Sequence, residues 1–488
     1  MSLLFEWLEN AVQGRTAAGG SGHAIIYHDT YLSWRGLLHR VERRARELAA
    51  MGLQAQDWVG LMLGNDPEFV VLTLALSKLD AVVVPIDPTT GGRDLDMTLG
   101  AAPLRAIITR PNAIDPLAAP SGTLRLGSLP HAPRAIADSR HRISGTLLSC
   151  ALYPWTRPQL DGEEAPEVVL FTLDSGGDPK AVVRSSTQLL GIANALGSAF
   201  ALRPGANVLC AASLFDCQGF DLGLLAALPR GATLHLDDGT AGPRMAKLLS
   251  DQSIDLYAAT PRDFAALARV THSKPLGRAT KLVCSGAPLP VAVARACHKR
   301  FGVPILSCYH SCEAGPVAID LDGTAPESVG TPLPGVEVRV AKSTGADLAV
   351  GKNGAIWVCG ASVATTFLPT LPVRGGDIAV GRGRHKGWLR TGDVGHFDNN
   401  NRLHLSHRED DLVMVDRRPV SLGEIESCLE SLAQVKAAQA HVEYDDDGST
   451  NIVVRITPGG RCKTEIMLDH CAKRLAPHKV PRRIEIAD

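Results

Sequence analysis

The sequence predicts an α/β protein with a large N-terminal domain of layered α/β subdomains and a small C-terminal α+β domain. Strand-like and helix-like segments alternate through the first two thirds of the chain, as they do in layered α/β folds. After about residue 330 the segments become shorter and are separated by Gly and Asn turns, which indicates a β-rich subdomain. A length of 488 residues exceeds what a single hydrophobic core usually serves.

An amphipathic helix is predicted over residues 33–51, because apolar residues recur there at helical spacing and the first residue, a serine, suits an N-cap. An apolar run at 58–63 follows, then a helical segment at 67–79 that begins with proline, then an apolar run at 81–85. A strand, a helix and a strand of these lengths indicate a parallel βαβ unit.

Further buried strands are predicted from short apolar runs separated by Ala/Leu-rich helical stretches. They are 105–109, 168–172, 207–211, 233–236 and 281–285. Strands of the β-rich subdomain are predicted at 336–340, 355–359 and 402–406, and the C-terminal unit at helix 422–432, strands 437–442 and 452–456, and helix 463–475. The expected domains are therefore 1–408, with its β-rich subdomain at about 330–408, a boundary segment at 409–411, and a small domain at 412–488.

Composition excludes several classes of protein. Lys and Arg number 50 and Asp and Glu 51, for a formal net charge of -1, so no overall basic field attracts nucleic acid. Residues 1–15 lack the pattern of a signal peptide, and no apolar run reaches the roughly 18 residues of a membrane span. The eleven cysteines lack the spacing of a zinc site. We expect a cytoplasmic protein without a membrane span, a nucleic-acid partner or a cysteine-bound metal.

Residues 171–180, FTLDSGGDPK, combine hydroxyls, two adjacent glycines and a lysine after an apolar strand. Glycine lets backbone N–H groups approach phosphate oxygens, hydroxyls add donors, and lysine supplies positive charge. Thr172, Ser175, Gly177 and Lys180 are therefore candidates for phosphate binding. Taken alone, such a segment is more often an ordinary turn.

The segment resembles the phosphate loop, usually TSGTTGxPKG, of the adenylate-forming superfamily of acyl-CoA synthetases, nonribosomal adenylation domains and luciferases. The resemblance extends along nearly the whole chain, through further elements in the family's order. They are a βαβ element at 65–88, SGAPL at 285–289, YHSCE at 309–313, VGTPLPGVEV at 329–338, WLRTGD at 388–393, REDD at 408–411 and GEIE at 423–426. Several motifs in the right order are far more specific than any one of them.

The resemblance implies an ATP site with Mg²⁺. Tyr309 would stack on the adenine, and Glu313 would bind Mg²⁺, which prefers carboxylate and phosphate oxygens. Asp393 would accept hydrogen bonds from both ribose hydroxyls, and Arg408 would reach the ribose or the phosphates. The implied catalytic residues are Lys180, Glu313 and Arg408, and the implied nucleotide-binding residues are Thr172, Ser175, Gly177, Gly286, Ala287, Pro288, Tyr309, Ser311, Asp393 and Arg408, with Glu313 as the metal ligand.

The chain departs from the family pattern around the phosphates. Leu173 and Gly176 replace two hydroxyl residues, so two donors are missing. Asp174 stands where the family has glycine and should repel a polyphosphate unless Mg²⁺ intervenes. His310 replaces the glycine of the family's YGxTE motif. These changes predict a lowered affinity for ATP.

Residues 215–219, FDCQG, leave the class of acid open. Amino-acid-activating relatives use an aspartate in an FDxS motif to hold the substrate amine, and Asp216 stands at that position. Here Gln218 replaces the serine, and the spacing to Gly219 fits the acyl-CoA type better. Amino-acid adenylation therefore stays an alternative.

In the C-terminal domain, Asp410 matches the family hinge, about which the small domain rotates between an adenylating and a thioester-forming pose. Arg417 replaces the glycine that lies beside the pantetheine in the second pose. The sequence also stops before the family's PxxxxGK stretch, whose lysine binds the substrate carboxylate and ATP. Lys473 and Lys479 are the nearest candidates to replace it.

The resemblance implies a two-step ligase for a small aryl or acyl carboxylic acid. MgATP converts the acid into an acyl-AMP, and the thiol of coenzyme A or of a phosphopantetheine on an acyl carrier protein then displaces AMP. The altered loop, Arg417 and the short C-terminal end favour a carrier protein and a biosynthetic pathway. The opposing interpretation is a family member that has lost catalysis and acts as a ligand-binding or scaffold protein. No motif fixes the identity of the acid.

Overall fold

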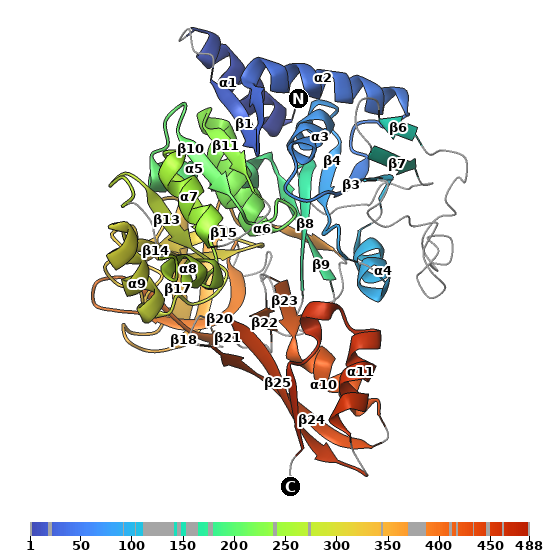
Figure 1. The fold of residues 1–488 in the computed structure, drawn as a ribbon, viewed down its shortest axis with the longest axis vertical. Coiled ribbons are helices and arrows are strands. Elements are labelled where there is room, and N and C mark those ends of the chain that lie inside the picture. The colour runs from blue at the N-terminus through green and yellow to red at the C-terminus, as the bar shows by residue number, and fades with distance from the viewer. Residues whose placement is uncertain are drawn as a thin grey trace.

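A computed structural model describes most of the chain (Figure 1). The described residues are 2–17, 22–90, 92–102, 104–110, 141–143, 148–152, 164–173, 179–237, 242–271, 275–342, 345–368, 387–408, 412–415, 418–432, 434–445, 449–460 and 463–486. Figure 1 shows a large body of sheets and helices, with the C-terminal elements gathered in a smaller lobe at its lower end.

The predicted βαβ unit is confirmed. Strands β3 (Trp58–Met62) and β4 (Val82–Pro85) are parallel neighbours, joined by helix α3 (Pro67–Lys78). The Asp66 carboxylate caps this helix by accepting the N–H of Glu68 at 2.8 Å, and proline occupies its first turn. The turn of the unit is therefore fixed by local chemistry.

The predicted amphipathic helix is also confirmed, as α2 (Trp34–Ala50). The Ser33 hydroxyl caps it by accepting the N–H of Gly36 at 3.1 Å. Leu37, Val41 and Leu48 lie on one face at helical spacing and are buried. The apolar stripe thus packs into the body as the sequence pattern requires.

One large sheet has eight strands in the order β19-β9-β8-β4-β3-β5-β7-β6. Its centre, from β8 to β5, is parallel, and antiparallel strands are added on both sides. Its remaining strands are β5 (Ala106–Thr109), β6 (His141–Ile143), β7 (Leu148–Leu152), β8 (Pro166–Leu173), β9 (Pro179–Ser185) and β19 (Thr366–Leu368).

The other large sheet has nine strands in the order β16-β15-β14-β13-β12-β10-β11-β1-β2, with a parallel centre. Its strands are β1 (His23–Tyr27), β2 (Thr30–Ser33), β10 (Asn207–Cys210), β11 (Thr233–Leu236), β12 (Leu256–Ala259), β13 (Lys281–Cys284), β14 (Ile305–Ser311), β15 (Gly315–Ile319) and β16 (Thr331–Pro332). The strands predicted near residues 105, 168, 207, 233 and 281 are therefore confirmed as members of the two sheets.

Helices pack around these sheets and connect them. They are α1 (Leu3–Ala17), α4 (Gly92–Ala101), α5 (Ser186–Phe200), α6 (Cys217–Gly219), the π-helix η2 (Phe220–Leu225), the 3-10 helix η3 (Leu228–Arg230), α7 (Pro243–Asp251), α8 (Pro261–Ala268) and α9 (Val291–Phe301).

Strand β9 corrects the expectation that helices separate consecutive strands of the body. It follows β8 in the chain and pairs with it antiparallel, with Thr172 opposite Lys180. Its sequence, PKAVVRS, carries adjacent β-branched valines and is buried over five residues, which favours a strand. Helix α5 follows directly, with Ser185 as its N-cap.

The expected shorter strands after residue 330 form a four-stranded antiparallel sheet, β17-β18-β20-β21. The C-terminal unit is a β-hairpin followed by a three-stranded sheet with two helices and a short 3-10 turn. The bounds are β17 (Val336–Ala341), β18 (Gly354–Gly360), β20 (Leu389–Phe397), β21 (Leu403–Arg408), β22 (Leu412–Val415), β23 (Arg418–Ser421), α10 (Leu422–Glu430), β24 (Val435–Tyr444), β25 (Thr450–Pro458), α11 (Thr464–Arg474), η4 (Pro477–Lys479) and β26 (Arg483–Ile486).

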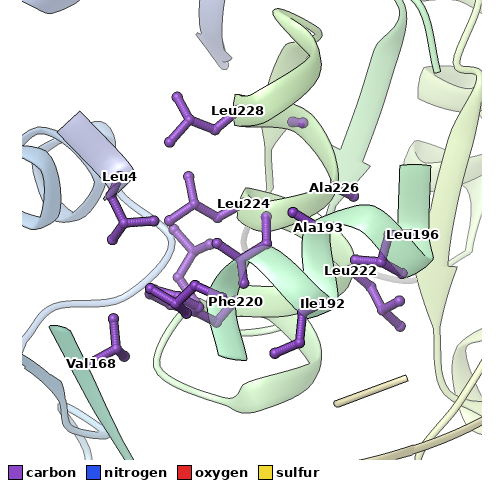
Figure 2. Close-up of a cluster of buried hydrophobic side chains, with 14 of the residues drawn as sticks. Leu4, Val168, Ile192, Ala193, Leu196, Phe220, Leu222, Leu224, Ala226 and Leu228 are labelled. Atoms are coloured by element: carbon purple, nitrogen blue, oxygen red, sulfur yellow. The ribbon is translucent and has the colours of Figure 1, made fainter. Parts of the chain in front are cut away.

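The π-helix η2 lies in the hydrophobic core. Figure 2 shows Phe220, Leu222 and Leu224 of η2 beside Ile192 of α5 and Leu4 of α1, and all of these side chains are buried. A π-helical turn is rare and costs hydrogen-bond geometry, so it persists where surrounding packing holds it. Among the described residues no helix is both long and apolar enough to cross a lipid bilayer.

Two adjacent leucines of α5 test this core with a matched pair. Leu189 is 0% exposed and Leu190 is 44% exposed. Leu189→Ala should lower the free energy of unfolding by about 2–5 kcal/mol through cavity formation, whereas Leu190→Ala should change it by no more than about 0.5 kcal/mol. Urea unfolding followed by circular dichroism measures both, and equal effects would contradict the placement of α5.

Candidate functional site

The candidate residues gather where strands β13 and β14 end. The two strands are parallel neighbours, so their carboxyl ends meet at one edge of the sheet, the usual place for a ligand site in α/β proteins. Gly286 follows β13 with a φ of +89°, a left-handed conformation that favours glycine. Ala287 is half-buried and Pro288 is exposed, so this turn is accessible to a ligand.

Three predicted nucleotide-binding residues form a cluster around Asp393. Asp393 on β20 lies opposite Arg408 on β21, and Arg408 Nη1 donates to Asp393 Oδ1 at 3.1 Å. The Tyr309 hydroxyl at the end of β14 donates to Asp393 Oδ2. Burial and the Asp393 carboxylate raise the pKa of Tyr309 well above its ordinary value, so the phenol stays protonated as a donor. We call these three residues the Asp393 cluster.

Lys180 and Glu313 form a second pair. Lys180 Nζ on β9 lies 2.9 Å from Glu313 Oε1, in the turn after β14. Burial would raise the pKa of Glu313, but the positive charges of Lys180 and Arg408 outweigh it and hold the pKa below its ordinary value. Glu313 is therefore ionised. Thr172 lies opposite Lys180 on β8, half-buried.

The donor set fits Mg²⁺ only together with phosphate oxygens. Among the described residues no group of three or more His, Cys, Asp or Glu side chains could hold a metal ion. Mg²⁺ is often bound by one or two carboxylates while a nucleotide and water supply the remaining ligands. Glu313 is the ionised carboxylate that suits this arrangement.

Of the other predicted site residues, Ser311 has a local structural role, and several lie outside the described part of the chain. The Ser311 hydroxyl oxygen accepts the N–H of Ala314 at 3.1 Å and so shapes the turn that carries Glu313. The phosphate-loop residues Ser175 and Gly177, the departures Asp174 and Gly176, the hinge residue Asp410, and Arg417 lie outside the described residues.

His310 belongs to a buried charged network that the sequence did not reveal. The Arg184 guanidinium on β9 donates to both carboxylate oxygens of Asp221 on η2, at 2.6 and 3.1 Å, and to the backbone carbonyl of Cys312 at 2.7 Å. His310 Nε2 lies 2.8 Å from Asp221 Oδ2. The side chains of Arg184 and Asp221 are 0% exposed and that of His310 is 3% exposed. We call these residues the Arg184 network.

Arg184 and His310 determine the charge state of Asp221 in this network. Burial would raise the pKa of Asp221, but Arg184 and His310 hold it below its ordinary value, so Asp221 is ionised. An ionised carboxylate only accepts hydrogen bonds, so His310 Nε2 carries a hydrogen and donates it. A glycine-to-histidine departure was the one signal of this network in the sequence, because Arg184 and Asp221 match no local pattern.

Asp216 has a local structural role. It caps α6, where its carboxylate accepts the N–H of Gln218 at 3.2 Å. Asn65 holds the preceding loop, since its side-chain amide donates to the carbonyls of Ala212 and Asp237 and accepts the N–H of Leu214, at 2.8–2.9 Å. The segment that carries residues 215–219 is thus fixed from two sides.

The two lysines considered as replacements for the family's C-terminal lysine pair within the C-terminal segment. Lys479 is buried, with Nζ 3.0 Å from Glu424 Oε2. Lys473 is exposed and pairs with Asp469 one helical turn away, at 2.5 Å. Glu313 and Asp393 are instead paired with Lys180 and Arg408.

The hairpin β22–β23 contacts the large body near the candidate site. Strand β23 lies against β8, the strand that leads into the predicted phosphate loop. Arg418 on β23 reaches Asp87 Oδ2 at 2.6 Å and the Thr89 hydroxyl at 2.8 Å, just beyond the carboxyl end of β4. This contact fixes the pose of the C-terminal unit in the structure.

Known proteins resemble the chain over nearly its whole length. A family model described as "AMP-binding enzyme" matches residues 14–368. A probable CoA ligase of Humulus lupulus is 26% identical and covers 95% of this chain and 89% of its own length. A feruloyl-CoA synthase of Amycolatopsis is also 26% identical, with coverages of 95% and 92%. The solved o-succinylbenzoate CoA synthetase of Bacillus subtilis has a TM-score of 0.80 at 20% identity and covers 99% of this chain and 94% of that one.

Asp393→Asn should weaken ATP binding because it removes an ionised acceptor from the Asp393 cluster. Hydrogen bonds to charged groups contribute about 1.5–3 kcal/mol, so the Kd should rise by roughly 10-fold to 100-fold. Isothermal titration with ATP and Mg²⁺ measures it, with Asp322→Asn in an exposed turn as the control. An unchanged Kd would remove Asp393 from the nucleotide site.

Proposed function

The chain belongs to the AMP-binding enzyme family and is an adenylate-forming acid–thiol ligase, and from that premise we propose how its residues activate an acid and transfer it. The proposed reaction joins a small aryl or acyl carboxylic acid to a pantetheine thiol at the expense of ATP. The Asp393 cluster binds the ribose, and the Lys180–Glu313 pair receives the phosphates.

The observation that carries this proposal is that Arg408 interacts with both groups. Its guanidinium donates to Asp393, and its charge also lowers the pKa of Glu313. One guanidinium therefore links the proposed ribose site to the proposed phosphate site. Tyr309 and Glu313 come from the same turn of chain, four positions apart.

In the proposed first step, a carboxylate oxygen of the acid attacks the α-phosphorus of ATP, the bond to the β-phosphate oxygen breaks, and pyrophosphate leaves. Lys180 and Arg408 neutralise the charge on the phosphate oxygens, and the fixed geometry aligns the reactants. Mg²⁺ held by Glu313 would add positive charge at the phosphates. Lys180 and Glu313 neutralise each other before ATP binds. The free-energy cost of holding both charges in place is therefore small.

In the proposed second step, a thiol loses its proton to solvent, its sulfur attacks the acyl carbon, the bond from that carbon to the phosphate oxygen breaks, and AMP leaves. The matched relatives are named as CoA ligases or synthases, which favours coenzyme A as the acceptor. A phosphopantetheine on an acyl carrier protein presents the same thiol and is the second acceptor to test. The name feruloyl-CoA synthase supports an aryl acid as the substrate.

We further propose that residues 1–408 and 412–488 act as two domains about a hinge at Asp410. The contact of Arg418 with Asp87 and Thr89 brings the hairpin β22–β23 to the edge of the body that carries the phosphate loop. We assign this pose to the transfer step, because it places the C-terminal unit beside the edge where a thiol must enter.

ATP–pyrophosphate exchange tests the ligase proposal directly. The wild-type protein should exchange label in the presence of at least one acid from a panel of aryl, fatty and amino acids. Lys180→Met should lower the exchange rate by about 10²–10³, the usual loss for one preorganised charged donor, whereas Lys352→Met at an exposed position should not. Tight ATP binding without exchange for any acid would instead support a ligand-binding or scaffold protein.

Arg418→Ala should separate the two steps. Loss of the contact with Asp87 and Thr89 should slow the decay of preformed acyl-AMP on addition of coenzyme A by several-fold, and leave pyrophosphate exchange nearly unchanged. Arg455→Ala, an exposed residue of the same C-terminal unit, is the matched control. Equal losses in both half-reactions would rule out this pose as the transfer pose.

A further inference from the structure

Gln218 carries a buried amide nitrogen that has no hydrogen-bond partner among the described residues. The residue is 5% exposed, and its Nε2 atom makes no hydrogen bond within the described residues. A buried N–H group left unpaired destabilises a fold, and most such groups in native proteins are satisfied. Gln218 therefore has a donor that is ready for a ligand.

The position of this amide is fixed by the backbone. The N–H of Gln218 donates to Asp216, and the loop before it is held by Asn65. The next residue, Gly219, packs so closely that a Cβ there would lie 2.2 Å from the carbonyl oxygen of Ser213. A shift of this segment that paired the amide nitrogen with another protein group would break these contacts.

The amide faces the turn after β13. A Cβ built on Gly286 would lie 3.6 Å from Gln218 Oε1 and 4.0 Å from Thr260 Cγ2, which are ordinary contacts. Gly286 is itself exposed. Gln218 thus borders the same accessible turn that begins the candidate site.

Gln218 belongs to the segment that leads into η2, whereas the Asp393 cluster belongs to β14, β20 and β21. The consecutive residues Tyr309 and His310 point to different partners, Tyr309 to Asp393 and His310 to Asp221 on η2. Helix α6, with Gln218, directly precedes η2. If an acyl-adenylate extends from the nucleotide past β14 toward η2, its acyl part approaches Gln218.

The surroundings on that side are polar, and most of their polar groups are paired, although Arg184 Nε has no hydrogen-bond partner among the described residues. Arg184 and Asp221 are bonded to each other, and His310 donates to Asp221. Its other ring nitrogen, Nδ1, lies 4.0 Å from Cys217 Sγ. Contact with Cys312, burial and nearby carboxylates raise the pKa of Cys217 well above its ordinary value, so this thiol is protonated. A hydrocarbon ligand would leave the Gln218 amide unpaired here, whereas an oxygen acceptor would pair it.

We propose that Gln218 determines the acid specificity of the enzyme, donating its amide hydrogen to an oxygen acceptor on the acyl part of the substrate. This inference rests on the proposed function. The substrate class is then an aryl acid that carries a ring hydroxyl, rather than an unsubstituted aryl or fatty acid. A site that pairs a substrate hydroxyl rejects the analogue without it, because the site's own polar group is left unpaired.

The test uses matched acids in ATP–pyrophosphate exchange. The 2-, 3- and 4-hydroxy derivatives of benzoate and cinnamate are each compared with the methyl derivative of the same position, which has nearly the same shape. The wild-type protein should favour the hydroxy acid at one position by at least about 10-fold in kcat/KM, mainly through KM. Gln218→Met should lose that preference, and Gln252→Met, an exposed glutamine, should keep it.

A second measurement is independent of activity. Gln218→Met removes an unpaired polar group, so its urea midpoint without ligand should equal or exceed that of the wild type. A lower midpoint would show that the amide has a structural partner and would overturn the inference. Exchange without any hydroxyl preference, or a preference that survives in Gln218→Met, would overturn it as well. Absence of exchange with every acid would instead reject the ligase proposal on which the inference rests.

Discussion

The buried ion pair between Arg184 and Asp221 is the interaction on which the geometry of the site depends. Arg184 belongs to β9 of the eight-stranded sheet, and its third contact, the carbonyl of Cys312, belongs to the turn after β14 of the nine-stranded sheet. Asp221 lies on the core-packed π-helix η2 (Figure 2). One ion pair therefore joins both large sheets and the helix between them. Removing either partner would leave a buried, uncompensated charge, which is strongly destabilising.

This constraint places the charged residues of the site. Lys180 lies on the same strand as Arg184, and Glu313 directly follows the carbonyl that Arg184 holds. The 2.9 Å contact between Lys180 and Glu313 is thus a consequence of how the two sheets are joined. Because these charges are neutralised within the protein, MgATP bound as proposed would replace existing partners rather than meet isolated buried charges, whose desolvation would be costly.

Different elements of the fold supply the different parts of the candidate site. The Asp393 cluster comes from the antiparallel sheet after residue 330, the phosphate residues come from the junction of the two large sheets, and Gln218 comes from the segment before η2. The hairpin β22–β23 adds a contact from the C-terminal unit at the edge of β8. Under the proposed roles, the residue that meets the acid is not one of those that bind ATP, so one nucleotide site could serve acids of different chemistry.

The sequence by itself determined the elements with strong local signals and the residues with motif neighbours. Helix α2 and the β3-α3-β4 unit follow from periodicity, caps and proline, and the ordered motifs brought Lys180, Tyr309, Glu313, Asp393 and Arg408 into view. The positions of Ser175, Gly177 and Asp410 stay predictions. Only the tertiary structure decided the antiparallel strand β9, the π-helix and the Arg184 network. The partners within the Arg184 network are separated by up to 128 positions along the chain, so no local pattern encodes that network. The unpaired amide nitrogen of Gln218 likewise cannot be predicted from the sequence, because whether a buried donor has a partner depends on which groups the fold places next to it.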